Sequence, residues 1–165
     1  MVTLKVLLEN HQNNGLFVLL DGVTDTRNMG AIIRSAAAVK ATAVVIPTNG
    51  SAQITGETIK TSAGGAFQIP ICRVNHLKDV VYLLQSYNIK SIVADEKAEQ
   101  NIFDIDLTKT VAIVMGAEDK GVSHGVRKLC SHSAKLPILG NMDSYNVSVA
   151  AGIFLYEAIR QRIKT

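Results

Sequence analysis

Polar side chains in an otherwise apolar stretch give the first sign of chemistry in this chain. Segment 21–34 contains Asn28, Gly30 and Arg34, and an Ala- and Ile-rich run surrounds the arginine. A guanidinium near the start of a helix suits a phosphate oxygen or a ribose hydroxyl. The arginine could equally lie along its own helix, or pair with an aspartate of the same segment, in a purely structural role.

A second polar segment, Gly116 to Gly121, directly follows an apolar run and contains Glu118. Its glycines have the spacing of a phosphate-binding loop, but Val122 and Ser123 stand where that loop needs Lys and Ser or Thr. The G-x-G-x-x-G dinucleotide fingerprint is also missing from the sequence. The segment therefore predicts a turn at a strand end that holds Glu118 near a ligand, with a plain surface turn as the alternative.

A third polar segment, 137–146, precedes a long apolar run and contains Ser144 and Asn146. Taken alone, it is explained by a helix that Ser144 or Asp143 caps. A Ser-His-Asp triad is not supported, since His124 is the sole histidine beside any of the three segments. The two cysteines lack zinc-site spacing and are expected to be buried, reduced thiols, and no metal is predicted.

Short apolar, β-branched runs precede these polar segments and predict the strands that position them. Runs without alternation are typical of strands buried on both faces of a parallel sheet. The predicted strands are 16–20, 42–46, 91–94 and 111–115, with a weaker candidate at 134–138, which Pro137 places at a sheet edge or strand end. Because ligands bind beyond the carboxyl ends of such strands, the three polar segments are expected to form one site.

Helical patterns alternate with the strands. The predicted helices are 28–40, which Asn28 would cap, 76–87, 122–131 and 145–163, and 49–65 is predicted to be a mobile loop with a short helix. The last helix is apolar around most of its circumference, which indicates burial in its own core or against another subunit. This alternation predicts an α/β fold with a mostly parallel sheet and helices on both faces.

Length and composition limit the class of protein and the number of domains. With 165 residues, 47% of them hydrophobic, and a formal net charge of +3, the chain is expected to be a single domain over residues 1–165. These values exclude a disordered or low-complexity protein, and the charge is too small to indicate a nucleic-acid binder by itself. The first apolar run has neither the length of a signal-peptide core nor that of a bilayer span, so a cytoplasmic protein without a membrane segment is expected.

In this order, the three segments resemble the SpoU (TrmH-like) family of RNA ribose 2′-O-methyltransferases, of the SPOUT class. The first is similar to the family motif N-x-G-x-x-x-R, and the second to G-x-E-x-x-G. The third is similar to I-P-M-x-G followed by S-L-N-V-S-V-A, with Leu136 to Gly140 and Ser144 to Ala150 at the matching positions. Gly64 to Pro70 and the Arg73-Val74 pair look most like the bacterial enzymes that methylate a guanosine of 23S ribosomal RNA.

The resemblance implies a C-terminal deep trefoil knot, a homodimer, S-adenosylmethionine as cofactor, and methyl transfer to a ribose 2′-hydroxyl of structured RNA, ribosomal RNA more than transfer RNA. It also implies a catalytic domain without the N-terminal RNA-binding domain of many relatives. It places cofactor contacts at Gly116, Leu136, Ile138, Gly140 and Tyr145. The catalytic positions fall at Asn28, Arg34, Glu118, Ser144 and Asn146, and RNA contacts are expected from Arg27, Arg34, Lys40, Lys60 and Arg73 around the site.

The sequence departs from the family pattern at Thr26, where Pro is common, and at Tyr145, where Leu is usual. Neither change removes a reactive group, although Tyr145 alters the expected cofactor pocket. Two alternatives belong to other functional classes: a non-catalytic RNA-binding or assembly factor with the same fold, and a small-molecule enzyme of flavodoxin type. The complete set of polar motif residues speaks against the first, and the lack of a phosphate-binding loop against the second.

Overall fold

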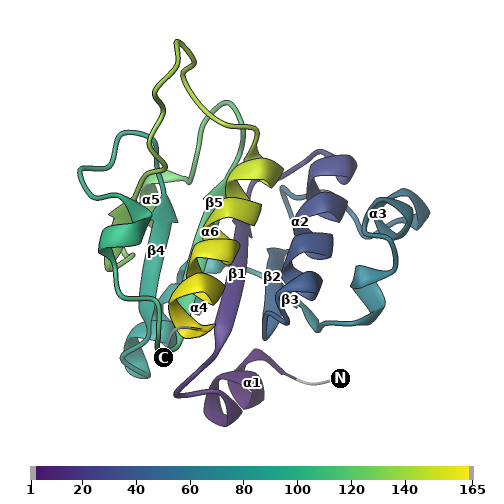
Figure 1. Cartoon of the computed structure of the whole chain (residues 1–165). Helices are drawn as coiled ribbons and strands as arrows, with labels where there is room; N and C mark the ends of the chain where they lie inside the picture. The colour runs from purple at the N-terminus through teal and green to yellow at the C-terminus, as the bar shows by residue number, and fades with distance from the viewer. Residues whose placement is uncertain (1–2, 164–165) are drawn as a thin grey trace.

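A parallel sheet of six strands, in the order β3-β2-β1-β5-β4-β6, forms the middle layer of the computed structural model, which describes residues 3–163 (Figure 1). All five strand pairings are parallel. The strands are Leu16–Asp21 (β1), Ala43–Pro47 (β2), Ile71–Val74 (β3), Lys90–Ala94 (β4), Val111–Gly116 (β5) and His132–Ala134 (β6). The predicted α/β class and parallel sheet are confirmed.

The central strands β1, β2 and β5 are buried along almost their whole length. Helices cover both of their faces, so the side chains that alternate along each strand enter one of two separate cores. One core includes Val18, Ile113 and Phe154, and the other includes Phe17, Val114 and Val81. The continuous apolar runs in the sequence are therefore the consequence of a sheet without a solvent-facing side.

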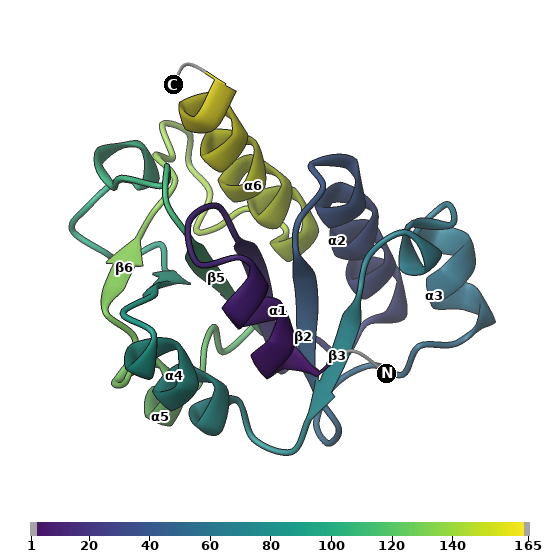
Figure 2. The same cartoon turned by 90° about the horizontal axis from the view of Figure 1, so that it is seen from below.

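Helices α2 (Thr26–Ala38) and α6 (Val147–Ile163) lie side by side on one face of the sheet (Figures 1 and 2). The opposite face is covered by α1 (Leu4–Asn10), α4 (Leu77–Ser86) and α5 (His124–Arg127). Helix α3 (Gly56–Thr61) and the 3-10 turn η1 (Gly65–Phe67) pack against α2, and a second 3-10 turn, η2 (Ile102–Asp104), follows β4. None of the described helices is long and apolar enough to cross a membrane.

Several boundaries differ from the predictions. The weak strand candidate at 134–138 is wrong for most of its length, because β6 ends at Ala134, although β6 does lie at the sheet edge. The expected helix at 122–131 is the single turn α5, while α1 and β3 were not predicted. Strand β3 has four half-buried or buried residues at the other sheet edge, too few to show a pattern in the sequence.

The chain after β6 runs along the loop that follows β4. Asp95 donates its backbone N–H to Ala134, and Lys135 exchanges backbone hydrogen bonds with Gln100 and Ile102 at 2.9 and 3.0 Å. Leu136 is consequently buried between this loop and α6. These contacts bring the third polar segment to the carboxyl ends of β4 and β5.

The last turn of α6 is fixed at the other end of the strands, where β1 and β5 begin. Arg162 donates hydrogen bonds of 2.8–3.0 Å to four backbone carbonyls, those of Asn14, Gly15, Leu107 and Lys109. Burial among these groups lowers the pKa of its guanidinium. Arg162 therefore ties the C-terminal helix to the loops that lead into β1 and β5.

Candidate functional site

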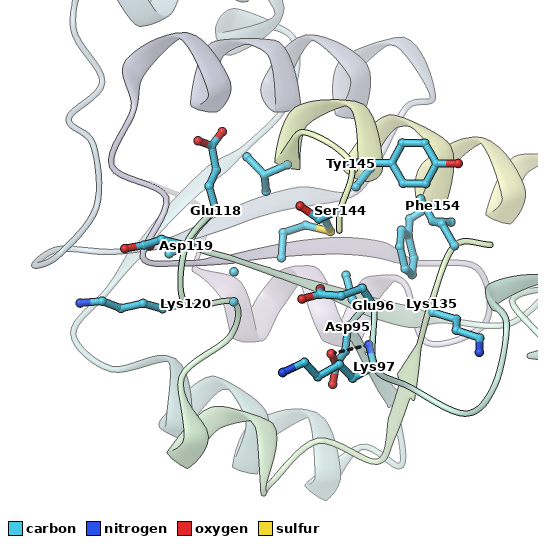
Figure 3. A pocket seen from close by; sticks show the side chains of 18 of the residues that line it. Asp95, Glu96, Lys97, Glu118, Asp119, Lys120, Lys135, Ser144, Tyr145 and Phe154 are labelled. Atoms are coloured by element: carbon cyan, nitrogen blue, oxygen red, sulfur yellow. Dashed lines mark hydrogen bonds between the residues drawn. The ribbon is translucent and has the colours of Figure 1, made fainter. Parts of the chain in front are cut away.

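A cavity of about 240 Å³ opens at the carboxyl ends of β4 and β5, beside the start of α6 (Figure 3). Its apolar part is formed by Met115, Leu136, Val147 and Phe154. Charged side chains surround this floor, with Glu118 on one side and Asp95 and Glu96 on the opposite side. The cavity thus offers an apolar floor together with acidic and basic groups at its edge.

The predicted cofactor residues largely meet at this cavity. Gly116, Leu136, Ile138 and Tyr145 line it, as does Ser144 from the predicted catalytic set. Gly140 does not line it, and instead faces a neighbouring hollow that shares Ile138. The segment 137–145 carries both sets of residues, so it forms the wall between the two hollows.

Gly116 ends β5 where the chain turns back tightly on itself. Ala117 and Gly121 exchange two backbone hydrogen bonds of 3.1 and 2.8 Å, and Gly121 adopts a φ of +67°. A Cβ on Gly116 would lie 2.1 Å from the Gly121 carbonyl carbon and from the Val122 nitrogen. The two motif glycines therefore allow this turn to press against the strand end, and the turn presents Glu118 at the cavity.

Three motif side chains from distant parts of the sequence form one hydrogen-bonded cluster. Asn28 donates a short amide hydrogen bond to Oε1 of Glu118. Asn146 donates to the same carboxylate oxygen and to Oδ1 of Asn28, each at 3.2 Å. The predicted convergence of the three polar segments is therefore realised in the structure, at the junction of α2, the 117–121 turn and α6.

Asn146 also caps α6. Its Oδ1 accepts hydrogen bonds from the backbone N–H groups of Ser148 and Val149, at 2.9 and 3.3 Å. The expectation that Ser144 or Asp143 caps this helix was wrong, because both lie before the turn that starts it. The cap fixes the orientation of the Asn146 amide, and its Nδ2 is thereby directed at Glu118 and Asn28.

The start of α2 is positioned by a different residue from the one predicted. Asp25 accepts hydrogen bonds of 2.9 Å from the backbone N–H groups of Arg27 and Asn28, so Asp25 and not Asn28 is the cap. This leaves the Asn28 side chain free to reach Glu118. Gly30 serves packing, since a Cβ there would lie 2.6 Å from Cβ of Thr61 on α3.

Arg34 lies apart from this cluster. It is exposed on α2, about 9 Å further along the helix axis than Asn28, and it does not line the cavity. Within residues 3–163 its guanidinium has no hydrogen bond or ion pair, so neither predicted structural partner holds it. Asp21 instead accepts the Ser123 N–H at 2.7 Å, and Asp25 caps α2.

The cavity also contains residues that the sequence analysis missed. Asp95, directly after β4, forms an ion pair with Arg127 of α5 and is largely buried. Phe154 contributes to the floor from the second turn of α6. Asp95 follows an apolar run, as the other polar segments do, and that position could have identified it.

The residues expected to contact RNA do not form a single ring around the site. Arg27, with a side chain 81% exposed, lies in the first turn of α2 near Glu57 of α3, and Lys60 is exposed on the same α3. Lys40 follows the far end of α2, about 20 Å away along the helix, so its expected position beside the site was wrong. Arg73 is half-buried and donates to Gln53 at 2.8 Å.

Residues 15–156 match the family model described as the SpoU rRNA Methylase family. The chain belongs to this family. Its similarity to curated SpoU relatives extends over nearly the whole chain. It is 42% identical over 159 residues to a 23S rRNA (guanosine-2′-O-)-methyltransferase, RlmB, of Pseudomonas putida, and 41% identical over 160 residues to the RlmB of Xanthomonas campestris. These alignments cover 96% and 97% of this chain but 64% of each relative, so this SpoU chain spans under two thirds of their length.

Solved SpoU structures have the same fold. The SpoU methyltransferase AviRb from Streptomyces viridochromogenes, in complex with the cofactor AdoMet, superposes with a TM-score of 0.86 at 31% identity. That match covers 93% of this chain and 62% of AviRb. The AdoMet-bound rRNA methyltransferase from Sinorhizobium meliloti gives a TM-score of 0.84 at 29% identity, over 93% of this chain and 59% of the other. This SpoU chain therefore has the fold of the matching part of those methyltransferases.

Proposed function

We propose that this chain transfers a methyl group from S-adenosylmethionine to a ribose 2′-hydroxyl of structured RNA, ribosomal RNA in preference to transfer RNA. One observation carries the proposal: Asn28, Glu118 and Asn146, from the three motif segments, meet at the edge of the cavity at the carboxyl ends of β4 and β5. The names of the RlmB relatives and of the AdoMet-bound SpoU structures support it.

The cavity has the features that the cofactor requires. Its apolar floor of Leu136, Val147 and Phe154 suits an adenine ring, and its acidic groups suit the positively charged sulfonium and amine of the ligand. The close turn at Gly116 holds the loop that carries Glu118 against the end of β5, where both border the cavity. When bound, the cofactor would supply an electrophilic methyl group, which an oxygen nucleophile can take while the sulfonium sulfur leaves as a neutral thioether.

The side chains of this chain orient the RNA and stabilise charge. The Asn28–Glu118–Asn146 cluster fixes the edge of the cavity where the ribose is proposed to lie, and Ser144 presents a hydroxyl beside it. Such orientation supplies most of the acceleration in an in-line displacement. Arg34, which has no hydrogen bond or ion pair within residues 3–163, stabilises the developing alkoxide, and an adjacent RNA phosphate accepts the proton, because a guanidinium is too weak a base.

The proposed RNA surface extends from the cavity over the start of α2 to α3. Arg27 and Lys60 are exposed there, and Arg34 lies on the same helix as Arg27. Among the residues first expected to bind RNA, these three are the ones that we propose contact its phosphates. Phosphate contacts of this kind make RNA affinity depend steeply on salt concentration.

The proposal includes a homodimer. Helix α6 buries Phe154 and Leu155 in its own core, yet its other face exposes Val149, Ile153 and Tyr156, at 51%, 38% and 66%. Their spacing places them in one stripe along the helix. An exposed apolar stripe next to the site supports a second copy of the chain as the partner that covers it.

The proposal also includes a trefoil knot and a cytoplasmic location. The hydrogen bonds of residues 134–135 with Asp95, Gln100 and Ile102 support a C-terminal segment that passes through the loop following β4. Two free cysteines, of which Cys72 is buried, fit a reducing compartment that contains ribosomes.

The deciding experiment incubates the protein with total ribosomal and transfer RNA and methyl-labelled S-adenosylmethionine. We expect the label on RNA, and mapping of the modified ribose identifies the nucleotide. Cofactor binding without label on any RNA would favour a non-catalytic RNA-binding factor. Absence of cofactor binding in calorimetry would overturn the proposal as a whole.

A further inference from the structure

The loop from Pro137 to Tyr145 projects beyond the carboxyl ends of the strands and leads into α6 (Figure 1). It carries Leu139 and Met142, which are 99% and 73% exposed, so its tip is not held by packing. Its two ends nevertheless line the cavity, through Ile138 on one side and Ser144 with Tyr145 on the other. The shape of the cavity therefore depends on how this loop is held.

Hydrogen bonding within the loop is almost absent. Among the described residues, none of 137–145 takes part in a backbone–backbone hydrogen bond. One contact joins the two ends of the loop: the hydroxyl of Tyr145 donates to the backbone carbonyl of Pro137 at 2.9 Å. A single side-chain hydrogen bond thus closes a loop that the backbone leaves open.

We propose that the Tyr145 hydroxyl is a positioning group that fastens this loop, and so holds Ile138 and Ser144 at the cavity in the arrangement that binds the cofactor. The inference rests on the proposed function for the identity of the ligand, but not for the loop closure. A loop without this bond must lose more conformational entropy when a ligand orders it, and affinity falls accordingly.

Replacement of the hydroxyl alone isolates the effect. Tyr145→Phe keeps the ring that lines the cavity and removes the donor to Pro137. The loss of one such hydrogen bond corresponds to about three- to tenfold weaker binding. Tyr82→Phe is the matched control, since Tyr82 is 56% exposed on α4, and within residues 3–163 its hydroxyl has no hydrogen bond.

The test combines NMR backbone order parameters without cofactor and calorimetry with S-adenosylmethionine. For Tyr145→Phe we expect lower order parameters confined to residues 138–144, unchanged order parameters in the sheet, and about three- to tenfold weaker cofactor binding. Tyr82→Phe is expected to match the wild type in both measurements. Equal order parameters of the loop in the wild type and Tyr145→Phe, or equal affinity despite a more mobile loop, would overturn the inference. A wild type that does not bind the cofactor refutes the proposed function, and the order parameters still decide whether the hydroxyl closes the loop.

Discussion

Asn28 and Asn146 lie 118 positions apart in the sequence, and a hydrogen bond of 3.2 Å joins their side chains. Each also donates to the same oxygen of Glu118, which makes the carboxylate the centre of the cluster. The cluster connects the first turn of α2 with the cap of α6, at the point where the turn after β5 meets both helices. The cluster thus links two helices and one turn at the edge of the candidate site.

Glu118→Ala removes the shared acceptor and leaves both amides without it. We expect methyl transfer to fall by about 100-fold or more, because small misplacements of reacting groups have effects of this size. Glu118 is exposed, so the melting temperature should stay within about 2 °C of the wild type. Initial rates with labelled cofactor and a thermal melt check both points. Glu118→Gln keeps an acceptor oxygen and serves as the control, and equal rates in Glu118→Ala and the wild type would contradict the assigned role.

Arg34→Ala is expected to abolish methyl transfer while cofactor binding persists. Cofactor binding should persist because Arg34 lies outside the cavity lining, and it has no protein partner among the described residues. Methyl transfer should be lost because the substitution removes the group proposed to stabilise the alkoxide. Arg34→Lys keeps the charge but not the planar fork, so an intermediate rate is expected. Turnover assays and calorimetry on the same preparations separate the two effects. Near-normal turnover in Arg34→Ala would contradict the proposed role of Arg34 in methyl transfer.

Gly116→Ala places a Cβ 2.1 Å from the backbone of the facing turn, which has to move away. We expect a melting temperature several degrees lower and cofactor binding weakened at least tenfold, since the turn carries Glu118 and borders the cavity. Gly56→Ala is the control, because nothing lies within 4 Å of a Cβ at that position. Calorimetry and thermal melts of both variants measure the difference. Wild-type affinity in Gly116→Ala would show that the close turn is not needed for binding.

RNA affinity is expected to fall linearly with the logarithm of salt concentration. Arg27→Ala and Lys60→Ala should each reduce the slope by about one, as expected for loss of one phosphate contact. Lys40→Ala should leave the slope unchanged, because Lys40 lies beyond the far end of α2. Filter binding of ribosomal RNA fragments between low and moderate salt measures all three. An effect of Lys40→Ala as large as that of Arg27→Ala would place the RNA elsewhere.

Ile153→Glu introduces a charge into the apolar stripe of α6. Ile153 is 38% exposed in the single chain, so the substitution should leave the fold of the monomer intact. In the proposed dimer the new carboxylate is buried against the partner copy, and we expect dissociation to monomers. Sedimentation of the wild type and the variant over a concentration series tests this. A wild type that remains monomeric throughout would refute the homodimer directly.

The sequence by itself determined most of the central strands and the motif residues of the candidate site. The apolar runs at 16–20, 42–46, 91–94 and 111–115 are four of the six strands, because side chains buried on both faces leave no alternation. The polar segments follow strand ends, and their motif residues identify the SpoU family. Local spacing contains this information, since periodicity and strand length are properties of neighbouring residues.

The tertiary structure decided which of those residues meet. Asp25 and Asn146, and not Asn28 and Ser144, cap the two helices, since a cap depends on backbone angles that residue type leaves open. Lys40 lies away from the site because α2 runs back from the carboxyl end of β1 to the start of β2. Asp95 lies within the site because the order of the strands places β4 beside β5. The contact of Asn28 with Glu118 spans 90 positions, and it exists because parallel strands β1 and β5 pair in register and end at the same edge.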